Sequence, residues 1–208
     1  MEGYRTDEEQ IEHLKKWWNE NGKSIIGGIA IGLIAIFGWR SWQEHLVTQG
    51  KEASDLYEHI IIDASKDKEK HVGEIAQQLN DDYKSTPYST FAKLLLAREA
   101  VEKDDIESAK NHLQWVLDNT DSDEFKHLAR LRLARLLLEE GDKDAALSLI
   151  EKIDAGKFAP NYHELRGDIL LQQGDSKAAQ DAYTQALSIR SNQPVVQMKL
   201  DDLGTNQL

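Results

Sequence analysis

The chain has 208 residues, and its 37 acidic residues outnumber its 25 Lys and Arg residues, giving a net charge of −12 at pH 7. Nucleic-acid binding depends on clustered Lys and Arg, so this acidic balance argues against a nucleic-acid partner. Cysteine is absent, which excludes disulfides and thiolate chemistry but fits either a reducing or an oxidising compartment. With three prolines and no long alternating β-type run, the composition predicts a mostly helical protein.

An uncharged segment between Lys23 and Arg40 predicts a transmembrane helix. As a helix, residues 24–39 span about 24 Å, and the flanking residues extend them toward the hydrocarbon thickness of about 30 Å. Tryptophan pairs stand at both ends of the segment, where amphipathic rings favour the headgroup region, and long basic side chains reach outward from the same places. The predicted membrane-interface anchors are Trp17, Trp18, Lys23, Trp39, Arg40 and Trp42.

The residues before the segment predict a retained anchor rather than a cleaved signal peptide. They contain six acids and four bases, and no small-residue cleavage site follows the segment. Basic residues favour the N-terminal side, which predicts a cytoplasmic N-terminus. We therefore expect a cytoplasmic tail at 1–23, a transmembrane helix at 24–42 and a domain on the outer side of the membrane at 43–208.

Gly28 and Gly32 form a GxxxG pattern within the transmembrane segment. Small residues at this spacing allow a second transmembrane helix to approach closely. Glycine is also common in transmembrane helices in general, so a lateral helix contact and mere composition both remain open.

After the anchor, apolar residues between 43 and 64 recur at helical spacing, which predicts that the helix continues. Three later segments each carry a small residue followed twelve positions on by alanine, with an acidic or glycine-rich turn between them. They succeed one another at offsets of 37 and 33 residues, close to the tetratricopeptide period of about 34. The pairs are Ala97 and Ala109, Ala134 and Ala146, and Gly167 and Ala179.

Each of these units leaves an apolar face uncovered, so the repeats must stack to be stable. Residues 46–84 are predicted to form a degenerate repeat, Pro87 to start the next helix, and residues 195–203 to cover the end of the array. The predicted fold is all-α: one N-terminal transmembrane helix followed by a tetratricopeptide-like helical-repeat solenoid. A generic helical bundle is the alternative.

The sequence predicts no catalytic, cofactor-binding or metal-binding residues. No two of its seven histidines have the HExxH spacing, and neither a GxSxG turn nor a glycine-rich dinucleotide turn is present. The histidines are predicted to be surface residues. An enzyme is therefore not expected.

A helical-repeat domain offers a concave wall made by the first helix of each pair, which fits a peptide or a helix. The alternative is that the charges on this wall only keep an otherwise apolar array in solution. The candidate groove residues are Phe91, Leu94, Arg98, Leu131, Arg135, Leu138, Glu164, Asp168 and Leu171.

Taken together, the chain resembles the YfgM-type inner-membrane proteins of Gram-negative bacteria. The resemblance rests on residues 6–10 (TDEEQ), on Trp17 and Trp18, on residues 20–23 (ENGK) and on residues 38–40 (GWR), with residues 165–168 (LRGD) in the repeat half. It implies a single-pass protein with a periplasmic repeat domain, acting as an ancillary subunit of the Sec translocon beside the membrane-anchored chaperone PpiD. It also implies a link to envelope-stress signalling through a response regulator.

Two functions follow as hypotheses. The first is an accessory scaffold at the secretion channel, contacting a periplasmic chaperone and emerging secretory proteins. The second is a signalling adaptor whose cytoplasmic tail sequesters a response regulator. In that tail Ile11, Leu14 and Trp18 form an amphipathic pattern, which fits partner binding or contact with the membrane surface.

Overall fold

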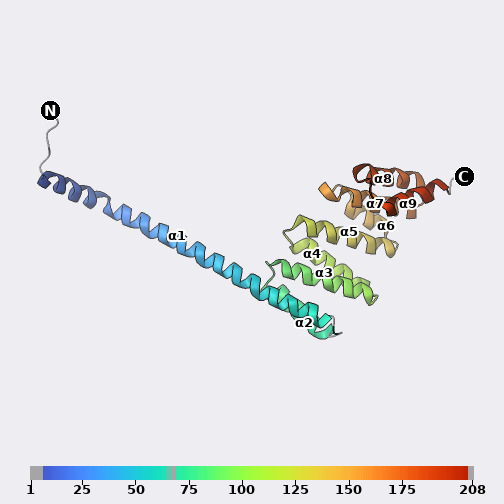
Figure 1. Cartoon of the computed structure of the whole chain (residues 1–208), viewed down its shortest axis with the longest axis horizontal. Helices are drawn as coiled ribbons and strands as arrows, with labels where there is room; N and C mark the ends of the chain where they lie inside the picture. The colour runs from blue at the N-terminus through green and yellow to red at the C-terminus, as the bar shows by residue number, and fades with distance from the viewer. Residues whose placement is uncertain (1–6, 65, 67–68, 206–208) are drawn as a thin grey trace, which may run out of the picture. The chain divides into compact units, whose positions relative to one another are not determined.

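The computed structural model describes residues 7–64, 66 and 69–205, and within these residues every regular element is helical (Figure 1). The start of the tail, including Thr6, lies outside the described residues. The chain forms two compact units, Met1–Glu52 and Ala53–Leu208, which are described separately below. The prediction of an all-α protein is confirmed.

The first unit is built from α1 (Asp7–Ala64), which contains the predicted transmembrane segment and continues beyond it, as the sequence indicates. Its central apolar side chains have no neighbours to cover them: Ile31 is 71% exposed and Ile34 is 72% exposed. By length and composition, α1 is the one helix among the described residues that is able to cross a membrane. The predicted span is therefore a continuous helix with an apolar surface.

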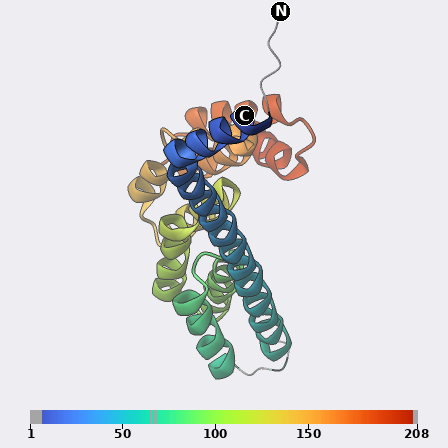
Figure 2. The same ribbon diagram turned by 90° about the vertical axis from the view of Figure 1, so that its left-hand side faces the viewer.

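The second unit begins with the last turns of α1 and continues as helical hairpins joined by short turns. In Figures 1 and 2 the colour passes in order from green through yellow to red along the hairpins, so consecutive hairpins are neighbours. The helices are α2 (Glu69–Asp82), α3 (Pro87–Glu102), α4 (Ile106–Asn119), α5 (Asp123–Glu139), α6 (Lys143–Ile150), α7 (Ala159–Gln172), α8 (Ser176–Ile189) and α9 (Pro194–Thr205), with a 3-10 turn at Gly156–Phe158.

The turns inside the three predicted repeats share one chemistry. An aspartate caps the second helix of each hairpin by accepting a hydrogen bond from a backbone N–H three residues later. The distances are 3.1 Å for Asp105 and Ser108, 3.1 Å for Asp142 and Ala145, and 2.9 Å for Asp175 and Ala178. The residue before each cap has a positive φ, namely 61° at Asp104, 86° at Gly141 and 89° at Gly174. Glycine and aspartate tolerate this conformation, so the predicted turns are confirmed.

Small residues lie where the two helices of each hairpin cross, as predicted. Ala97 and Ala109 belong to one core cluster, and Ala134 and Ala146 belong to the next. In the third hairpin a Cβ added at Gly167 would lie only 2.6 Å from Cδ1 of Tyr183, a fully buried ring. Glycine at this position therefore allows the tyrosine to pack directly on the α7 backbone.

Both ends of the array are covered. The end of α1 and α2 form their own core through Ala53, Ile60 and Leu79, which are completely buried, so the degenerate repeat is a helical hairpin. Pro87 begins α3 as predicted. At the other end, α9 places Val196 and Leu203 against α8, so it covers the apolar face of the last hairpin.

Candidate membrane segment and partner-binding surfaces

The four tryptophans predicted as membrane-interface anchors are all more than half exposed, and Lys23 and Arg40 are exposed as well. Trp18 also packs on its own helix, since its Cε2 lies 3.1 Å from a Cβ that would be added at Gly22. These side chains are placed so that lipid headgroups can reach them. Their contact with a membrane interface stays a prediction.

Gly28 and Gly32 present an open strip of backbone. A Cβ added at either glycine would meet nothing within 4 Å. No contact within the described part of the chain therefore accounts for these glycines, and the lateral helix contact stays a prediction.

Three of the predicted groove residues lie in the hydrophobic core. Leu94 is 9% exposed, Leu131 is 5% exposed and Leu138 is 7% exposed, and each belongs to a core cluster. Their spacing fits a helix face that packs against the neighbouring hairpin rather than one that stays open. They are not available as surface contacts for a partner.

Phe91 lies in a half-buried aromatic group that joins α1, α3 and α5. Its ring centroid is 5.7 Å from that of Tyr57, 5.9 Å from that of Tyr88 and 5.3 Å from that of Phe125. Such tilted and edge-to-face contacts add stability beyond the area that they bury. Phe91 therefore ties the degenerate first hairpin to the repeats that follow.

Glu164 and Asp168 are held by a lysine from the last helix. Nζ of Lys199 lies 2.9 Å from Oε1 of Glu164 and 2.8 Å from both carboxylate oxygens of Asp168. The Tyr183 hydroxyl donates a hydrogen bond of 2.7 Å to Asp168. All of these groups are at least partly buried, so the network fixes α9 on α7 and α8. Leu171, the remaining groove candidate on α7, is 38% exposed.

The protonation of this network follows from its surroundings. Burial alone would lower the pKa of Lys199, but its hydrogen bonds to Asp168 and Glu164 outweigh burial and raise the pKa above the usual range. Burial, the hydrogen bond to Asp168 and the nearby negative charge raise the pKa of Tyr183. Lys199 is therefore charged and Tyr183 neutral at physiological pH.

Arg98 and Arg135 come together at one hollow, which has a volume of about 350 Å³ and is formed by α3, α4 and α5. Ala97, Leu113 and Leu136 form its apolar floor. The sequence places the two arginines at equivalent repeat positions, and in the structure both line this hollow. The third arginine of the hollow, Arg132, and the exposed Val101 beside it were not predicted.

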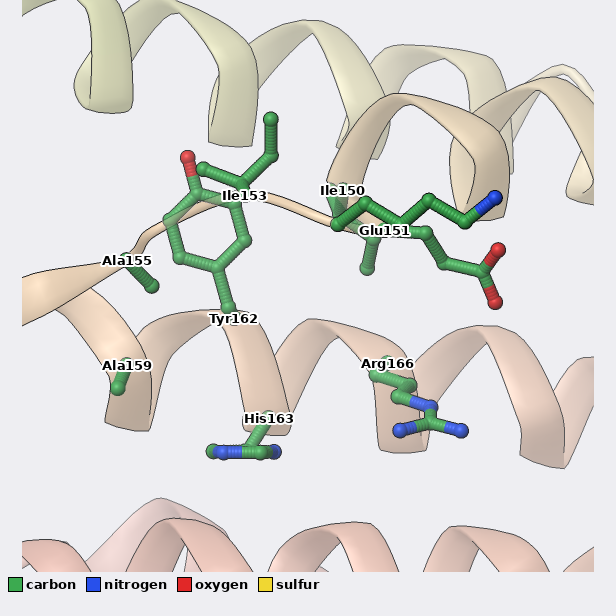
Figure 3. A pocket seen from close by; sticks show the side chains of 9 residues that line it. Ile150, Glu151, Ile153, Ala155, Ala159, Tyr162, His163 and Arg166 are labelled. Atoms are coloured by element: carbon green, nitrogen blue, oxygen red, sulfur yellow. The ribbon is translucent and has the colours of Figure 1, made fainter.

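A second hollow of about 400 Å³ lies between the end of α6 and α7 and contains none of the predicted groove residues. Figure 3 shows Tyr162 pointing from α7 toward the segment that carries Ile153 and Ala155, with His163 and Arg166 further along the same helix. Burial and the charge of Arg166 lower the pKa of His163, so this imidazole is neutral at pH 7. The hollow therefore combines an apolar wall with a rim of mixed charge.

The prediction that the histidines are surface residues is wrong for His127. Its ring stacks on Phe158 with centroids 4.8 Å apart, and its Nδ1 lies 2.9 Å from the Tyr162 hydroxyl. This half-buried histidine joins α5 to α7 across 35 residues of sequence, a separation that spacing rules do not reach. Within the described residues no group of three or more His, Cys, Asp or Glu side chains is placed to hold a metal ion.

Comparison with known proteins decides the family. The "Tetratricopeptide repeat-like domain" family matches residues 15–205. A Haemophilus influenzae protein named "Ancillary SecYEG translocon subunit" is 34% identical over 95% of this chain and 97% of its own length. An Escherichia coli protein of the same name is 33% identical over 98% of this chain and 100% of its own length. The chain belongs to this family. A Neisseria gonorrhoeae protein of that name, at 26% identity over 98% of the chain, is a more distant relative.

Family membership agrees with the architecture. The match includes the repeat array and most of the apolar helix, so the tetratricopeptide-like solenoid is confirmed in preference to a generic helical bundle. With one helix of membrane-spanning length and composition among the described residues, the chain is a single-pass membrane protein.

Proposed function

We propose that this chain is a non-catalytic ancillary subunit of a bacterial Sec translocon. The observation that carries the proposal is the extent of the similarity: relatives named as ancillary SecYEG translocon subunits align with 95% and 98% of the chain, through the apolar helix as well as the repeats. An exposed apolar helix and a stack of helical repeats fit such a subunit, because the helix would anchor the repeats in the membrane beside the channel.

We propose further that α1 contacts a channel subunit through its glycine face. Helical geometry, at about 100° per residue, puts Ile25 and Ile36 beside the Gly28–Gly32 strip and Ala30 and Ile34 on the opposite face. A photo-crosslinking residue at Ile25 or Ile36 should capture a channel subunit in intact membranes. The same residue at Ala30 or Ile34 should capture little or none.

Enlarging the strip tests the same contact. Gly28→Leu with Gly32→Leu should abolish the crosslink from Ile36, because bulky side chains keep a second helix at a distance. Ala30→Leu with Ile34→Leu is the matched control and should leave the crosslink intact. Equal crosslinking from both faces, or none from either, would contradict the proposed contact.

We propose that the N-terminus is cytoplasmic and that the repeat domain lies in the periplasm of the inner membrane, with residues 1–23, 24–42 and 43–208 as tail, span and domain. The chain contains no cysteine, so a single introduced cysteine reports on one site. A membrane-impermeant maleimide should label Lys177→Cys in cells whose outer membrane has been permeabilised. It should label Glu12→Cys only after the inner membrane is broken, and the reverse order would contradict this orientation.

In this orientation the repeat domain binds a membrane-anchored periplasmic chaperone of the PpiD type and contacts emerging secretory proteins. The exposed groove candidates Arg98, Arg135 and Leu171 support this part of the proposal. Affinity purification from detergent-solubilised membranes should recover the chaperone with the full chain. Its recovery with a chain whose repeat domain is replaced by an unrelated folded domain would argue against this role.

A second candidate function is a signalling adaptor that sequesters a response regulator. The observation that favours it is the tail, where Ile11, Leu14 and Trp18 are each more than half exposed. Deleting residues 1–16, which removes Ile11 and Leu14 and keeps Trp17 and Trp18 at the membrane interface, should release the regulator. The crosslink from Ile36 to the channel should persist in the same variant.

A further inference from the structure

We call the hollow between α3, α4 and α5 the arginine hollow. It combines an apolar floor with a charged rim. Three buried residues of the hydrophobic core, Ala97, Leu113 and Leu136, line it. Val101, in the last turn of α3, also lines the hollow and is 42% exposed. Its volume of about 350 Å³ lies at the small end of the range for ligand pockets, about 300–1,000 Å³.

The rim of the arginine hollow is cationic in a chain that is strongly anionic overall. Arg98, Arg132 and Arg135 face a single acid, Glu102, so the lining carries a net charge of +2 (3 − 1), against −12 for the whole chain. Arg98 pairs with Glu102 at 2.7 Å, and both side chains are more than half exposed. Exposed pairs of this kind contribute little to stability, so an incoming carboxylate can replace Glu102 as the partner of Arg98 at little cost.

The other two arginines are unpaired. Within the described residues, neither Arg132 nor Arg135 has an ion pair or a side-chain hydrogen bond, and both side chains are exposed. They lie three residues apart on α5, so their guanidinium groups reach the same side of the helix. Two unpaired, planar guanidinium groups beside one apolar hollow are suited to binding carboxylates in a bidentate manner.

We propose that the arginine hollow binds an acidic segment of a partner protein, with one bulky apolar side chain seated in the hollow and flanking carboxylates paired with Arg132 and Arg135. The inference rests on the proposed function only in taking the repeat domain to bind other proteins. Charge complementarity selects the acids, and the recessed floor selects the apolar residue. An anionic lipid surface would satisfy the arginines but leave the floor unfilled, so the geometry favours a protein segment.

The test uses the full chain in nanodiscs of zwitterionic lipid and three labelled ten-residue peptides. The first peptide carries Leu-Phe flanked by two Asp on each side, the second replaces Leu-Phe with Ser-Ser, and the third replaces every Asp with Lys. The first peptide should bind at least about tenfold more tightly than the others, as expected for charge-assisted bonds around a buried apolar contact. Its affinity should fall as salt rises, because the paired groups are exposed. Equal affinity for all three peptides would overturn the proposal.

Two sets of variants locate the site. Arg132→Gln with Arg135→Gln should weaken binding of the first peptide at least about tenfold, and Val101→Asp should weaken it by a similar factor. The matched control, Arg166→Gln with Lys177→Gln, makes the same change in net charge at exposed positions on α7 and α8 and should leave the affinity unchanged. Circular dichroism melts check that every variant is folded, and an equal loss in the control would overturn the assignment.

Two further readouts separate this inference from its alternatives. If Arg132→Gln with Arg135→Gln reduced binding to phosphatidylglycerol vesicles but not to the first peptide, the hollow would be a lipid site and the proposal would be overturned. The crosslink from Ile36 to the channel tests the proposed function separately. Failure of the unaltered chain to bind the first peptide, with the crosslink from Ile36 intact, would overturn only the inference. Binding of that peptide by a chain that gives no crosslink to the channel would overturn only the translocon role.

Discussion

The apolar segment of α1 and the repeat helices use similar residues in opposite ways. In the repeats, apolar side chains are buried between helices: Leu165 is 1% exposed and Ile169 is completely buried. In the α1 segment, Ile31 and Ile34 are more than 70% exposed. The difference is one of periodicity. A helix with apolar residues on one face packs against other helices, whereas a helix that is apolar all round needs lipid as its solvent.

The largest effect is expected when charge is placed in the apolar segment of α1, which tests whether that segment faces lipid. Ile31→Lys with Ile34→Lys should release the chain from the membrane, since each central lysine costs about 2.5–3.5 kcal/mol of insertion free energy. Alkaline extraction of membranes measures the effect. Val195→Lys with Met198→Lys, at exposed positions on α9, is the matched control and should stay in the membrane fraction. Retention of the first variant would contradict a lipid-facing segment.

The next largest effect is expected in the core of the repeats. Leu165→Ala should lower the free energy of unfolding by about 2–5 kcal/mol, because it leaves a cavity among fully packed side chains. Leu171→Ala, on the same helix at a site that is 38% exposed, should cost about 0.5 kcal/mol or less. Urea unfolding of the full chain in detergent compares the two variants. Equal costs would show that the α7 core is not packed as described.

A smaller cost is expected where α7 meets Tyr183. Gly167→Ala should destabilise the repeat domain by about 1–3 kcal/mol, because the new methyl group overlaps the tyrosine ring. Gly73→Ala, in α2 where an added Cβ meets nothing within 4 Å, should instead stabilise it by about 0.5–1 kcal/mol. The two variants therefore shift the urea midpoint in opposite directions. A stabilising Gly167→Ala would contradict the close helix crossing.

The Lys199 network should contribute stability that depends on pH. The pKa values of Lys199 and Tyr183 are both raised in the folded state. Their contributions are therefore fully present below the unfolded pKa values of about 10 and are lost as the pH rises above them. The urea midpoint should fall as the pH rises above about 10, and Lys199→Met should show a shallower fall. Identical pH profiles would rule out a linked network.

The smallest effects concern the helix caps. Asp142→Ala should cost about 1 kcal/mol of unfolding free energy, because the N–H of Ala145 loses its acceptor. Asp142→Asn should retain most of that stability, since asparagine also accepts this hydrogen bond. The equivalent substitutions at Asp105 and Asp175 should behave alike. A cost confined to one of the three sites would argue against repeats of equal construction.

Features set by residues close together in the sequence could be predicted, whereas contacts between residues far apart in the sequence could not. Helices, turns and crossing points were predictable because they rest on local patterns, such as Gly141 followed by Asp142. The spacing also identified helix positions at Leu94, Leu131 and Leu138, but it did not show that the next hairpin covers them. Burial of this kind is set by stacking between repeats.

The long-range polar contacts were not predictable in the same way. Lys199 binds Asp168 across 31 residues, and His127 meets Tyr162 across 35 residues. Neither pair has a characteristic spacing, because the separation depends on loop lengths and hairpin geometry. Arg98 and Arg135 were found by their equivalent repeat positions, whereas Arg132 has no arginine counterpart in the other repeats and emerged only from the structure.

A cysteine scan along α1 tests the central contrast most directly. Single cysteines replace Ile26, Ile31, Ile36, Glu44 and Lys51 in a chain that has no other cysteine, and a water-soluble maleimide is added to membranes open on both sides. The first three sites should remain unlabelled until the protein is denatured, while Glu44→Cys and Lys51→Cys should label within minutes. Equal labelling at Ile31→Cys and Lys51→Cys would show that water, not lipid, covers the apolar segment.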